Sequence, residues 1–305
     1  MKSISVENLS KSFVNGKEIV EAVKPLSFEI DKAELFGFIG PDGAGKTTLI
    51  RMLTTLILAD TGTATVDGFD VVNDYTEIRK RVGYMPGKFS LYQDLSVQEN
   101  LEFFATIFQT TVKENYHLIK DIYDQLAPFA NRPAGKLSGG MKQKLALCCA
   151  LIHKPTVLFL DEPTTGVDAV SRKEFWEMLK RLKEQGITIL VSTPYMDEAS
   201  LCDRVALMQD GKFLRIDTPS QIIKNYSKTL LAVKGREMFP LLQQLKQIDG
   251  IEMAYPFGEY HHIVLHKDTL SIDQIKSQLQ NIQELEIKST KPDIEDCFIY
   301  AMQNN

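Results

Sequence analysis

The sequence predicts an α/β protein whose β-sheet core carries a phosphate-binding loop and is followed by a small α+β domain. Three observations support this class. The apolar run "ELFGFIG" leads into a glycine-rich turn and then into "KTTLIRMLTTLI", which has helical spacing. Two further apolar runs, "TVLFLDEP" and "ITILVST", have the composition of buried parallel strands. Beyond about residue 220, short strands alternate with amphipathic helices and no phosphate motif occurs.

The remaining elements follow in order along the chain. "ISVENLSKSF" alternates apolar and polar residues, as a half-buried strand does, and "LSFEID" repeats the pattern. "TGTATVDGFDV" predicts another strand with a turn, and helical periods dominate residues 96–152. "SRKEFWEMLKRLKEQG" predicts an amphipathic helix that ends at Gly186. "DRVALMQDGKFLRID" predicts a hairpin that turns at Asp210-Gly211.

The composition narrows the class of protein. The 305 residues are 44% hydrophobic and 25% charged, which suits a soluble core-forming chain. The net charge of −5 argues against a nucleic-acid partner, which usually requires a basic face. No signal peptide is visible, and no run approaches the roughly 18 apolar residues that span a bilayer. A membrane function would therefore need a membrane part from another chain.

The segment "GPDGAGKTT" matches the phosphate-loop pattern GxxxxGK[ST] in full. Its glycines allow successive backbone N–H groups to point at one phosphate chain, and the following helix adds its positive N-terminus. Lys46 places a positive charge on the β- and γ-phosphates, and the Thr47 hydroxyl can ligate Mg²⁺. The predicted nucleotide-binding residues are Gly40, Pro41, Asp42, Gly43, Ala44, Gly45, Lys46, Thr47 and Thr48.

Two carboxylates end the apolar strand "VLFLDE". Asp161 at the carboxyl end of the strand would hold Mg²⁺, often through water. Glu162 would polarise the attacking water as catalytic base, with Lys46 as the second catalytic residue.

A second glycine pair precedes a helix in "LSGGMKQKLALCCAL". Ser138 and the two glycines form another helix N-terminus that can bind an anion. A chain with one phosphate cradle needs a second only if that cradle completes the site of a different subunit. The predicted segment comprises Leu137, Ser138, Gly139, Gly140, Met141, Lys142 and Gln143.

These motifs together resemble those of the ATP-binding subunits of ABC transporters. The Walker A motif is Gly40–Thr48, the signature is Leu137–Gln143, the Walker B motif is Val157–Glu162, and "TTGVDAVSR" matches the D-loop with Asp168. The resemblance implies a P-loop NTPase fold with a β-sheet core and a helical subdomain, and ATP with Mg²⁺ as its ligands. It also implies a head-to-tail pair, in which one subunit's Walker motifs and the other's signature hold each ATP.

The extent of the resemblance sets the expected domains. It covers about residues 1–220, with the helical subdomain at about 88–150, and it implies that Phe13 stacks on adenine. "VGYMPGKFSLYQDLSVQENLEFFA" resembles exporter subunits that pair with ABC-2 type permeases. "KPDIEDCFIYAM" resembles the end of an accessory C-terminal domain, which we place at residues 221–305.

This resemblance also implies partners and a location. The chain would dock as a peripheral subunit on the cytoplasmic face of the plasma (inner) membrane and couple ATP hydrolysis to transport through a separate permease. Lys88–Leu101 would receive the coupling helix of the permease.

Two positions depart from the family pattern. A glutamine is expected after "GYMP", where this chain has Gly87, and a histidine is expected after "ST", where it has Pro194. By resemblance the glutamine contacts Mg²⁺ or the lytic water, and the histidine donates a hydrogen bond to the γ-phosphate. Glycine has no side chain to offer, and proline has no N–H. Asp42 replaces the usual asparagine and adds a negative charge beside the phosphates.

The departures predict a site that holds ATP but hydrolyses it slowly. Because the signature is intact, they favour an asymmetric heterodimer in which this chain completes the active site of a partner. The alternatives are a homodimer in which Glu162 alone sustains turnover and a nearly inactive regulatory subunit. A soluble ABC protein of translation or DNA repair is a further rival, but its tandem domains, coiled coils or zinc inserts are not found in this sequence.

Other residues carry no expected chemistry. Cys148, Cys149, Cys202 and Cys297 lack metal or disulfide spacing and are expected to be buried thiols. His261, His262 and His266 are expected to be surface histidines on a strand rather than a zinc site. Trp176 is expected to lie in the core.

Overall fold

The computed structural model describes residues 2–303 except 17, 89 and 267–269. The chain divides into two compact units. Unit 1 runs to Pro219 and takes in the chain again from Ala301, and unit 2 is Ser220–Tyr300. The fold is an α/β fold, as the sequence predicts.

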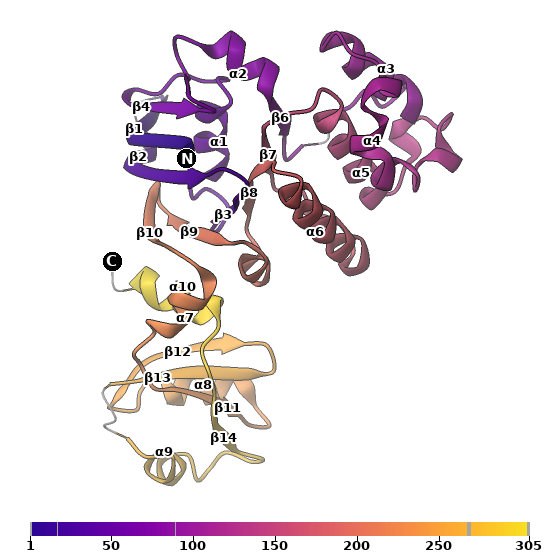
Figure 1. Ribbon diagram of the computed structural model, residues 1–305. Helices are drawn as coiled ribbons and strands as arrows, with labels where there is room; N and C mark the ends of the chain where they lie inside the picture. The colour runs from indigo at the N-terminus through magenta and orange to yellow at the C-terminus, as the bar shows by residue number, and fades with distance from the viewer. Residues whose placement is uncertain (1, 17, 89, 267–269, 304–305) are drawn as a thin grey trace. The chain divides into compact units, whose positions relative to one another are not determined.

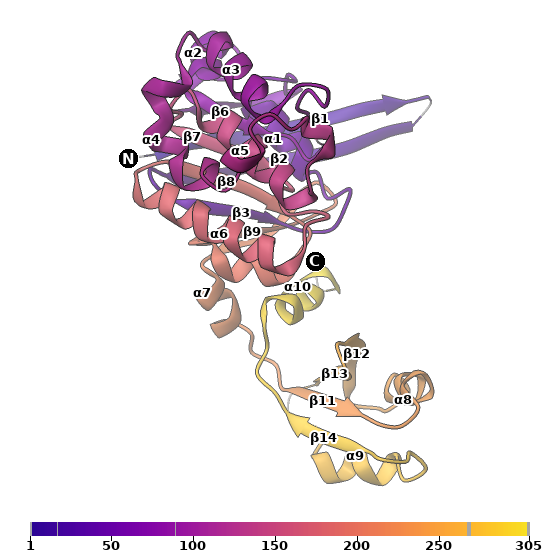
Figure 2. The same cartoon turned by 90° about the vertical axis from the view of Figure 1, so that its right-hand side faces the viewer.

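Unit 1 begins with a four-stranded antiparallel sheet whose strand order is β2-β1-β4-β5. Its strands are β1 (Lys2–Asn15), β2 (Glu18–Asp31), β4 (Thr61–Val66) and β5 (Phe69–Asp70). The long β1–β2 hairpin extends away from the rest of unit 1 (Figure 2). The alternation in "ISVENLSKSF" and "LSFEID" predicted both strands, because one of their faces packs on the core.

A second, six-stranded sheet forms the centre of unit 1, with the order β10-β9-β3-β8-β7-β6. All neighbours except β9 and β10 run parallel. Its strands are β3 (Leu35–Ile39), β6 (Val82–Met85), β7 (Val157–Asp161), β8 (Thr188–Thr193), β9 (Arg204–Gln209) and β10 (Lys212–Asp217). Every residue of β3, β7 and β8 is buried, so these strands are near-continuous apolar runs. Their carboxyl ends lie at one edge of the sheet, where parallel sheets place ligand sites.

The helices of unit 1 are mostly those that the sequence predicts. They are α1 (Lys46–Leu53), α2 (Tyr75–Arg81), α3 (Val97–Ile107), α4 (Val112–Tyr123), α5 (Gly139–Leu151) and α6 (Ala169–Glu184). Helices α3, α4 and α5 form a group of their own beside the central sheet (Figure 1). The pattern "KTTLIRMLTTLI" overestimates α1, since Thr55 adopts a left-handed backbone (φ 62°) just after the helix ends.

Unit 2 contains a four-stranded antiparallel sheet with the order β12-β13-β11-β14. Its strands are β11 (Leu230–Lys234), β12 (Ile251–Phe257), β13 (Tyr260–Leu265) and β14 (Glu286–Ser289). The accompanying helices are α8 (Met238–Leu245) and α9 (Ile272–Gln278), together with most of α7 (Pro219–Lys224) and of α10 (Ile294–Gln303). Ile263 and Leu265 belong to one apolar cluster and Val264 to another, so β13 is covered on both faces.

This double covering corrects the prediction for two of the three histidines. His261 and His262 are only 4% and 6% exposed, because β13 is an inner strand with both faces packed. The His261 Nε2 lies 2.7 Å from the Met238 carbonyl oxygen, and the His262 Nδ1 lies 2.6 Å from Asp296 Oδ1. His266 is exposed, as predicted. Within the described ranges, no group of three metal-ligating side chains could hold a metal ion.

The buried Asp296 carboxylate organises this part of unit 2. It accepts hydrogen bonds from Tyr255 Oη at 2.8 Å and from the Asp293 N–H at 2.9 Å, and it contacts His262. Burial by itself would raise the pKa of Asp296, but these hydrogen bonds hold it below its ordinary value. Because the folded-state pKa is depressed, this carboxylate stabilises unit 2 at pH values above the ordinary pKa of an aspartate. The contribution is lost as pH falls through the folded-state pKa.

Replacing Asp296 with alanine is therefore expected to destabilise unit 2 by about 3–5 kcal/mol, since it leaves buried polar partners unsatisfied. Hydrogen exchange of the β12 and β13 amides in the full chain measures this change. Asp273→Ala, at an exposed position in α9, is the matched control and should leave exchange unchanged. Equal exchange in the Asp296→Ala and wild-type chains would contradict the assignment.

The predictions for the cysteines and for Trp176 are confirmed. All four cysteines are free and buried, and Trp176 is buried in α6. Among the helices that the structure describes, none combines the length and the apolar character that crossing a bilayer requires.

Candidate functional site

The Walker A loop, Gly40–Thr48, connects the end of β3 to α1. Two of its glycines, Gly40 and Gly45, are required by close backbone approaches. A Cβ on Gly40 would lie 2.1 Å from the Met208 carbonyl oxygen, and one on Gly45 would lie 2.3 Å from that of Ala22. Gly45 also has a left-handed backbone (φ 103°), which side chains other than glycine rarely adopt.

Lys46 is the first residue of α1, and its side chain is only 3% exposed. The Nζ atom donates to the carbonyl oxygens of Gly40 at 2.7 Å and Pro41 at 2.9 Å. Burial lowers the pKa of Lys46, and the Glu162 carboxylate 3.8 Å away opposes that shift. A phosphate chain along the loop would supply the counter-charge that such a buried ammonium needs.

Asp161 at the end of β7 is surrounded by hydroxyl donors. Its Oδ1 accepts hydrogen bonds from Thr47 Oγ1 at 3.0 Å and from Ser192 Oγ at 2.6 Å. A hydroxyl and a carboxylate in contact are the kind of oxygen ligands that Mg²⁺ takes together with water and phosphate oxygens. Thr47 and Asp161 therefore fit a Mg²⁺ ion.

Glu162 follows Asp161 directly and has an unusual backbone conformation. Its φ of 51° lies in the left-handed region, which costs a non-glycine residue on the order of 1 kcal/mol or more. Its N–H donates to both the carbonyl and the hydroxyl oxygen of Ser192, each at 3.1 Å. This turn aims the carboxylate toward the Walker A loop, where its Oε1 lies 3.8 Å from Lys46 Nζ.

One cavity joins most of the predicted nucleotide-binding residues, but Gly40 and Pro41 do not line it. It has a volume of about 470 Å³ and is lined by Phe13, Ala22, Asp42, Gly43, Ala44, Gly45, Lys46, Thr47, Thr48 and Glu162. The volume is typical of a small-molecule site. Phe13 is 42% exposed on β1, so its ring is accessible at the rim for stacking.

The two departures from the family pattern both border this site. Gly87 follows β6, and a Cβ placed on it would lie 3.1 Å from the Asp161 carbonyl oxygen and 3.7 Å from Glu162 Cβ. Pro194 follows Thr193 at the end of β8, and the Thr193 carbonyl accepts the Gly40 N–H at 3.3 Å. A side chain at either position would therefore start beside the carboxylates or the phosphate loop.

The signature begins helix α5 and lies outside that cavity. Ser138 caps the helix, because its Oγ accepts the Met141 N–H at 3.3 Å, and both Ser138 and Gly139 are exposed. None of residues 137–143 is among those that line the cavity at the Walker A loop. Asp168 of the D-loop caps α6 by accepting the N–H groups of Val170 at 3.1 Å and Ser171 at 3.0 Å.

Two residues of the site were missed by the sequence prediction. Ser192 bonds both Asp161 and the Glu162 N–H, and the "ST" pair before Pro194 was the signal that could have identified it. Ala22 of β2 lines the cavity, and no sequence pattern marks it.

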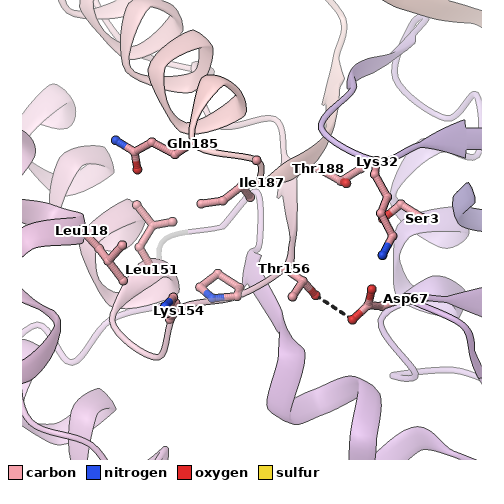
Figure 3. A pocket seen from close by; sticks show the side chains of 12 residues that line it. Ser3, Lys32, Asp67, Leu118, Leu151, Lys154, Thr156, Gln185, Ile187 and Thr188 are labelled. Carbon is pink, nitrogen blue, oxygen red and sulfur yellow. Dashed lines mark hydrogen bonds between the residues drawn. The ribbon is translucent and has the colours of Figure 1, made fainter. Parts of the chain in front are cut away.

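A different cavity, of about 260 Å³, lies where β7 and β8 begin (Figure 3). Leu118, Leu151 and Ile187 form its apolar wall, and on the polar side Thr156 donates to Asp67 at 3.0 Å. It contains no residue of the Walker or signature motifs. Of these two cavities, the one at the Walker A loop is lined by the residues predicted to bind phosphate.

Known proteins resemble this chain in both sequence and fold. Residues 23–165 match the family described as "ABC transporter". The chain is 39% identical to the probable multidrug ABC transporter ATP-binding protein YbhF of Escherichia coli K12, over 97% of this chain but 51% of that protein, so it spans about half of that relative's length. It is 35% identical to the linearmycin resistance ATP-binding protein LnrL of Bacillus subtilis over 97% of both chains. The ATP-binding cassette MJ0796, solved as a post-hydrolysis dimer with ADP and Pi, matches with a TM-score of 0.64, 26% identity and coverage of 70% of this chain and 98% of its own.

Proposed function

Because the chain belongs to the ABC transporter ATP-binding family, we propose that it binds MgATP and couples ATP binding and hydrolysis to transport through a separate membrane permease. The observation that carries this proposal is the cavity where the Walker A loop, Phe13 and Glu162 meet beside the Thr47–Asp161 pair. Residues 1–220 would form the ATP-binding domain, and residues 221–305 would form an accessory domain.

Each residue of the site would have a distinct role. The loop N–H groups and Lys46 hold the β- and γ-phosphates, and Phe13 stacks on the adenine. Thr47 and Asp161 hold Mg²⁺, which neutralises phosphate charge when bound. Glu162 orients and polarises the attacking water, since its carboxylate is directed toward the loop.

The permease would be of the ABC-2 type and would dock on the groove beside Lys88–Leu101. This docking would hold the chain on the cytoplasmic face of the membrane. An apolar cavity supports this docking place. It has a volume of about 460 Å³, and its lining includes Met85, Leu91, Phe104 and Phe108. Phe89 of this stretch lies outside the described residues. Two relatives are named for multidrug transport and linearmycin resistance, which supports an exporter.

ATP hydrolysis at this chain's own site would be slow, and the chain would work in an asymmetric dimer. Gly87 and Pro194 supply no side-chain donor beside the carboxylates, whereas the exposed signature remains available to a partner. A homodimer that hydrolyses at both sites is the alternative. The ATPase rate of the chain alone, compared with the rate after adding an ATP-binding subunit that has the glutamine and histidine, separates the two. In the heterodimer, we expect the ATPase rate of the mixture to exceed the sum of the rates of the two subunits measured alone. The homodimer predicts no such excess.

Replacing Lys46 with alanine tests the binding role. We expect the dissociation constant for MgATP to rise about 10- to 100-fold, because a charge-assisted contact to phosphate is worth roughly 1.5–3 kcal/mol. Displacement of a fluorescent ATP analogue from the purified chain measures this change. Lys113→Ala, at an exposed position in α4, is the matched control and should bind normally. Equal affinities of the Lys46→Ala and wild-type chains would remove the basis for the proposal.

A further inference from the structure

We propose that Glu198 is a positioning residue that links the ATP site of this chain to its D-loop and signature. The inference rests on the proposed function, because it assigns to ATP bound in the slow site an effect on the surface offered to a partner. Glu198 lies in the short 3₁₀ helix Met196–Leu201, four residues after Pro194.

The Glu198 carboxylate is buried between two hydroxyl groups. It is 1% exposed, and its Oε1 accepts a hydrogen bond from Thr164 Oγ1 at 2.8 Å while its Oε2 accepts one from Thr193 Oγ1 at 2.5 Å. A buried carboxylate is costly unless its oxygens are satisfied, so these contacts hold both threonines at fixed distances from it. One carboxylate therefore joins Thr193 at the end of β8 to Thr164 in the loop after β7, which are 29 residues apart in sequence.

Thr193 connects this carboxylate to the phosphate loop. Its carbonyl accepts the N–H of Gly40, the first residue of the Walker A motif, at 3.3 Å. Its hydroxyl also accepts the Tyr195 N–H at 3.1 Å, which fixes the backbone on the far side of Pro194. A shift of Gly40 on nucleotide binding would therefore move the Thr193 contact to Glu198.

Thr164 connects the same carboxylate to the D-loop. It lies two residues after Glu162, and its carbonyl accepts the Val167 N–H at 3.2 Å. Arg172 of α6 holds the other side of the 3₁₀ helix, with Nε 3.8 Å from Glu198 Oε1 and Nη2 3.1 Å from Asp197.

The D-loop segment in turn packs against the signature. A Cβ on Gly140 would lie 2.7 Å from Ser171 Oγ, and one on Gly139 would lie 3.3 Å from the Gly166 carbonyl oxygen. Gln143 and Thr164 line one narrow gap between α5 and the D-loop, which is too small to admit a water molecule. Because protein interiors are close-packed, a displacement of Thr164 cannot be absorbed without moving its neighbours on α5.

These contacts form a continuous physical connection from Gly40 through Thr193, Glu198 and Thr164 to the signature. It requires no side chain at position 194, so the proline leaves it intact. MgATP in the slow site would thereby bias the geometry of the signature that completes the site of the partner. A connection of this kind becomes coupling only if the nucleotide interacts differently with two arrangements of it, and this difference can be measured.

Hydrogen exchange of the full purified chain, with and without saturating MgATP, tests the proposal. The reporter amides are Thr165 and Val167 in the D-loop and Met141 and Lys142 in the signature. The first two donate to the carbonyls of Glu162 and Thr164, and the other two donate to Ser138 at the start of α5. We expect MgATP to change their exchange rates at least threefold in the wild-type chain. In Glu198→Gln, the dissociation constant for MgATP should stay within twofold of wild type, but this nucleotide-dependent change should disappear.

Asp197→Asn is the matched control, because Asp197 contacts the same Arg172 but is exposed. It should retain the full response. A merely structural role of Glu198 would instead raise exchange equally in both nucleotide states and lower the melting temperature. If Glu198→Gln fails to fold, Thr164→Val removes one of the two hydroxyl contacts and is expected to give the same loss of response.

Three results would contradict, in turn, the positioning role of Glu198, the coupling and the proposed function. A full response in Glu198→Gln, or in Thr164→Val where that variant replaces it, contradicts the positioning role. A wild-type chain that binds MgATP without any change at the four reporter amides contradicts the coupling. A wild-type chain that does not bind MgATP contradicts the proposed function instead.

Discussion

Replacing Gly87 with glutamine and Pro194 with histidine in one chain raises its rate of ATP hydrolysis by about 10²–10³-fold at saturating MgATP, because a single preorganised donor at a reacting phosphate is worth about that factor. Both side chains would start beside the reacting groups, since Gly87 borders Asp161 and Glu162 and Thr193 contacts Gly40. Gly87 has no left-handed backbone, and its Cβ would need the Asp161 carbonyl to yield by only a few tenths of an ångström. The backbone conformation at Gly87 is therefore compatible with a side chain.

The controls for this gain come from the same site. Each single variant should give a part of the increase, and the two parts need not multiply, because groups that act on one transition state are not additive. Adding Glu162→Gln to the double variant should abolish the gain if the new turnover occurs at this site. A gain that survives Glu162→Gln, or a double variant no faster than wild type, would show that Gly87 and Pro194 do not limit the site.

Replacing Gly139 with aspartate separates the two roles of the chain. In a dimer with a second ATP-binding subunit, we expect turnover at the site of the partner to fall at least 100-fold, since a carboxylate would face the phosphates at the helix N-terminus. The affinity of this chain for MgATP should fall far less than in Lys46→Ala, because residues 137–143 do not line its own cavity. The measurements are the ATPase rate of the dimer and the MgATP dissociation constant of the isolated chain.

Asn131→Asp adds the same charge at an exposed position in the loop before the signature and serves as the control. It should leave both quantities unchanged. If Gly139→Asp weakens MgATP binding by the isolated chain as much as Lys46→Ala does, the signature contacts the nucleotide of its own subunit and the head-to-tail arrangement is wrong.

Local patterns were sufficient to predict most of the fold. The buried strands β3, β7 and β8 are apolar runs that end in motif residues, so their carboxyl ends predicted where the loop at Gly40 and the carboxylate at Asp161 would meet. The glycine spacing in the Walker A motif likewise reflects backbone demands that the structure contains at Gly40 and Gly45.

Features that depend on distant parts of the chain could not be predicted in this way. His261 and His262 were assigned to the surface because the polarity of a side chain says nothing about whether both faces of its strand are packed. The Asp296 partner of His262 is 34 residues away in sequence. Thr164, Thr193 and Glu198 are ordinary polar residues in sequence, and only the fold brings them together. The left-handed backbone of Glu162 has no local signal either.

The turnover of MgATP by the purified wild-type chain alone tests the central claim most directly. Typical enzymes turn over about 10 times per second, and the loss of donors at Gly87 and Pro194 lowers this by about 10²–10³-fold. We therefore expect the chain to bind MgATP with a measurable dissociation constant and to hydrolyse it at no more than about 0.1 per second. Binding accompanied by turnover near about 10 per second would contradict the account, because it would show that the site works without the missing side chains.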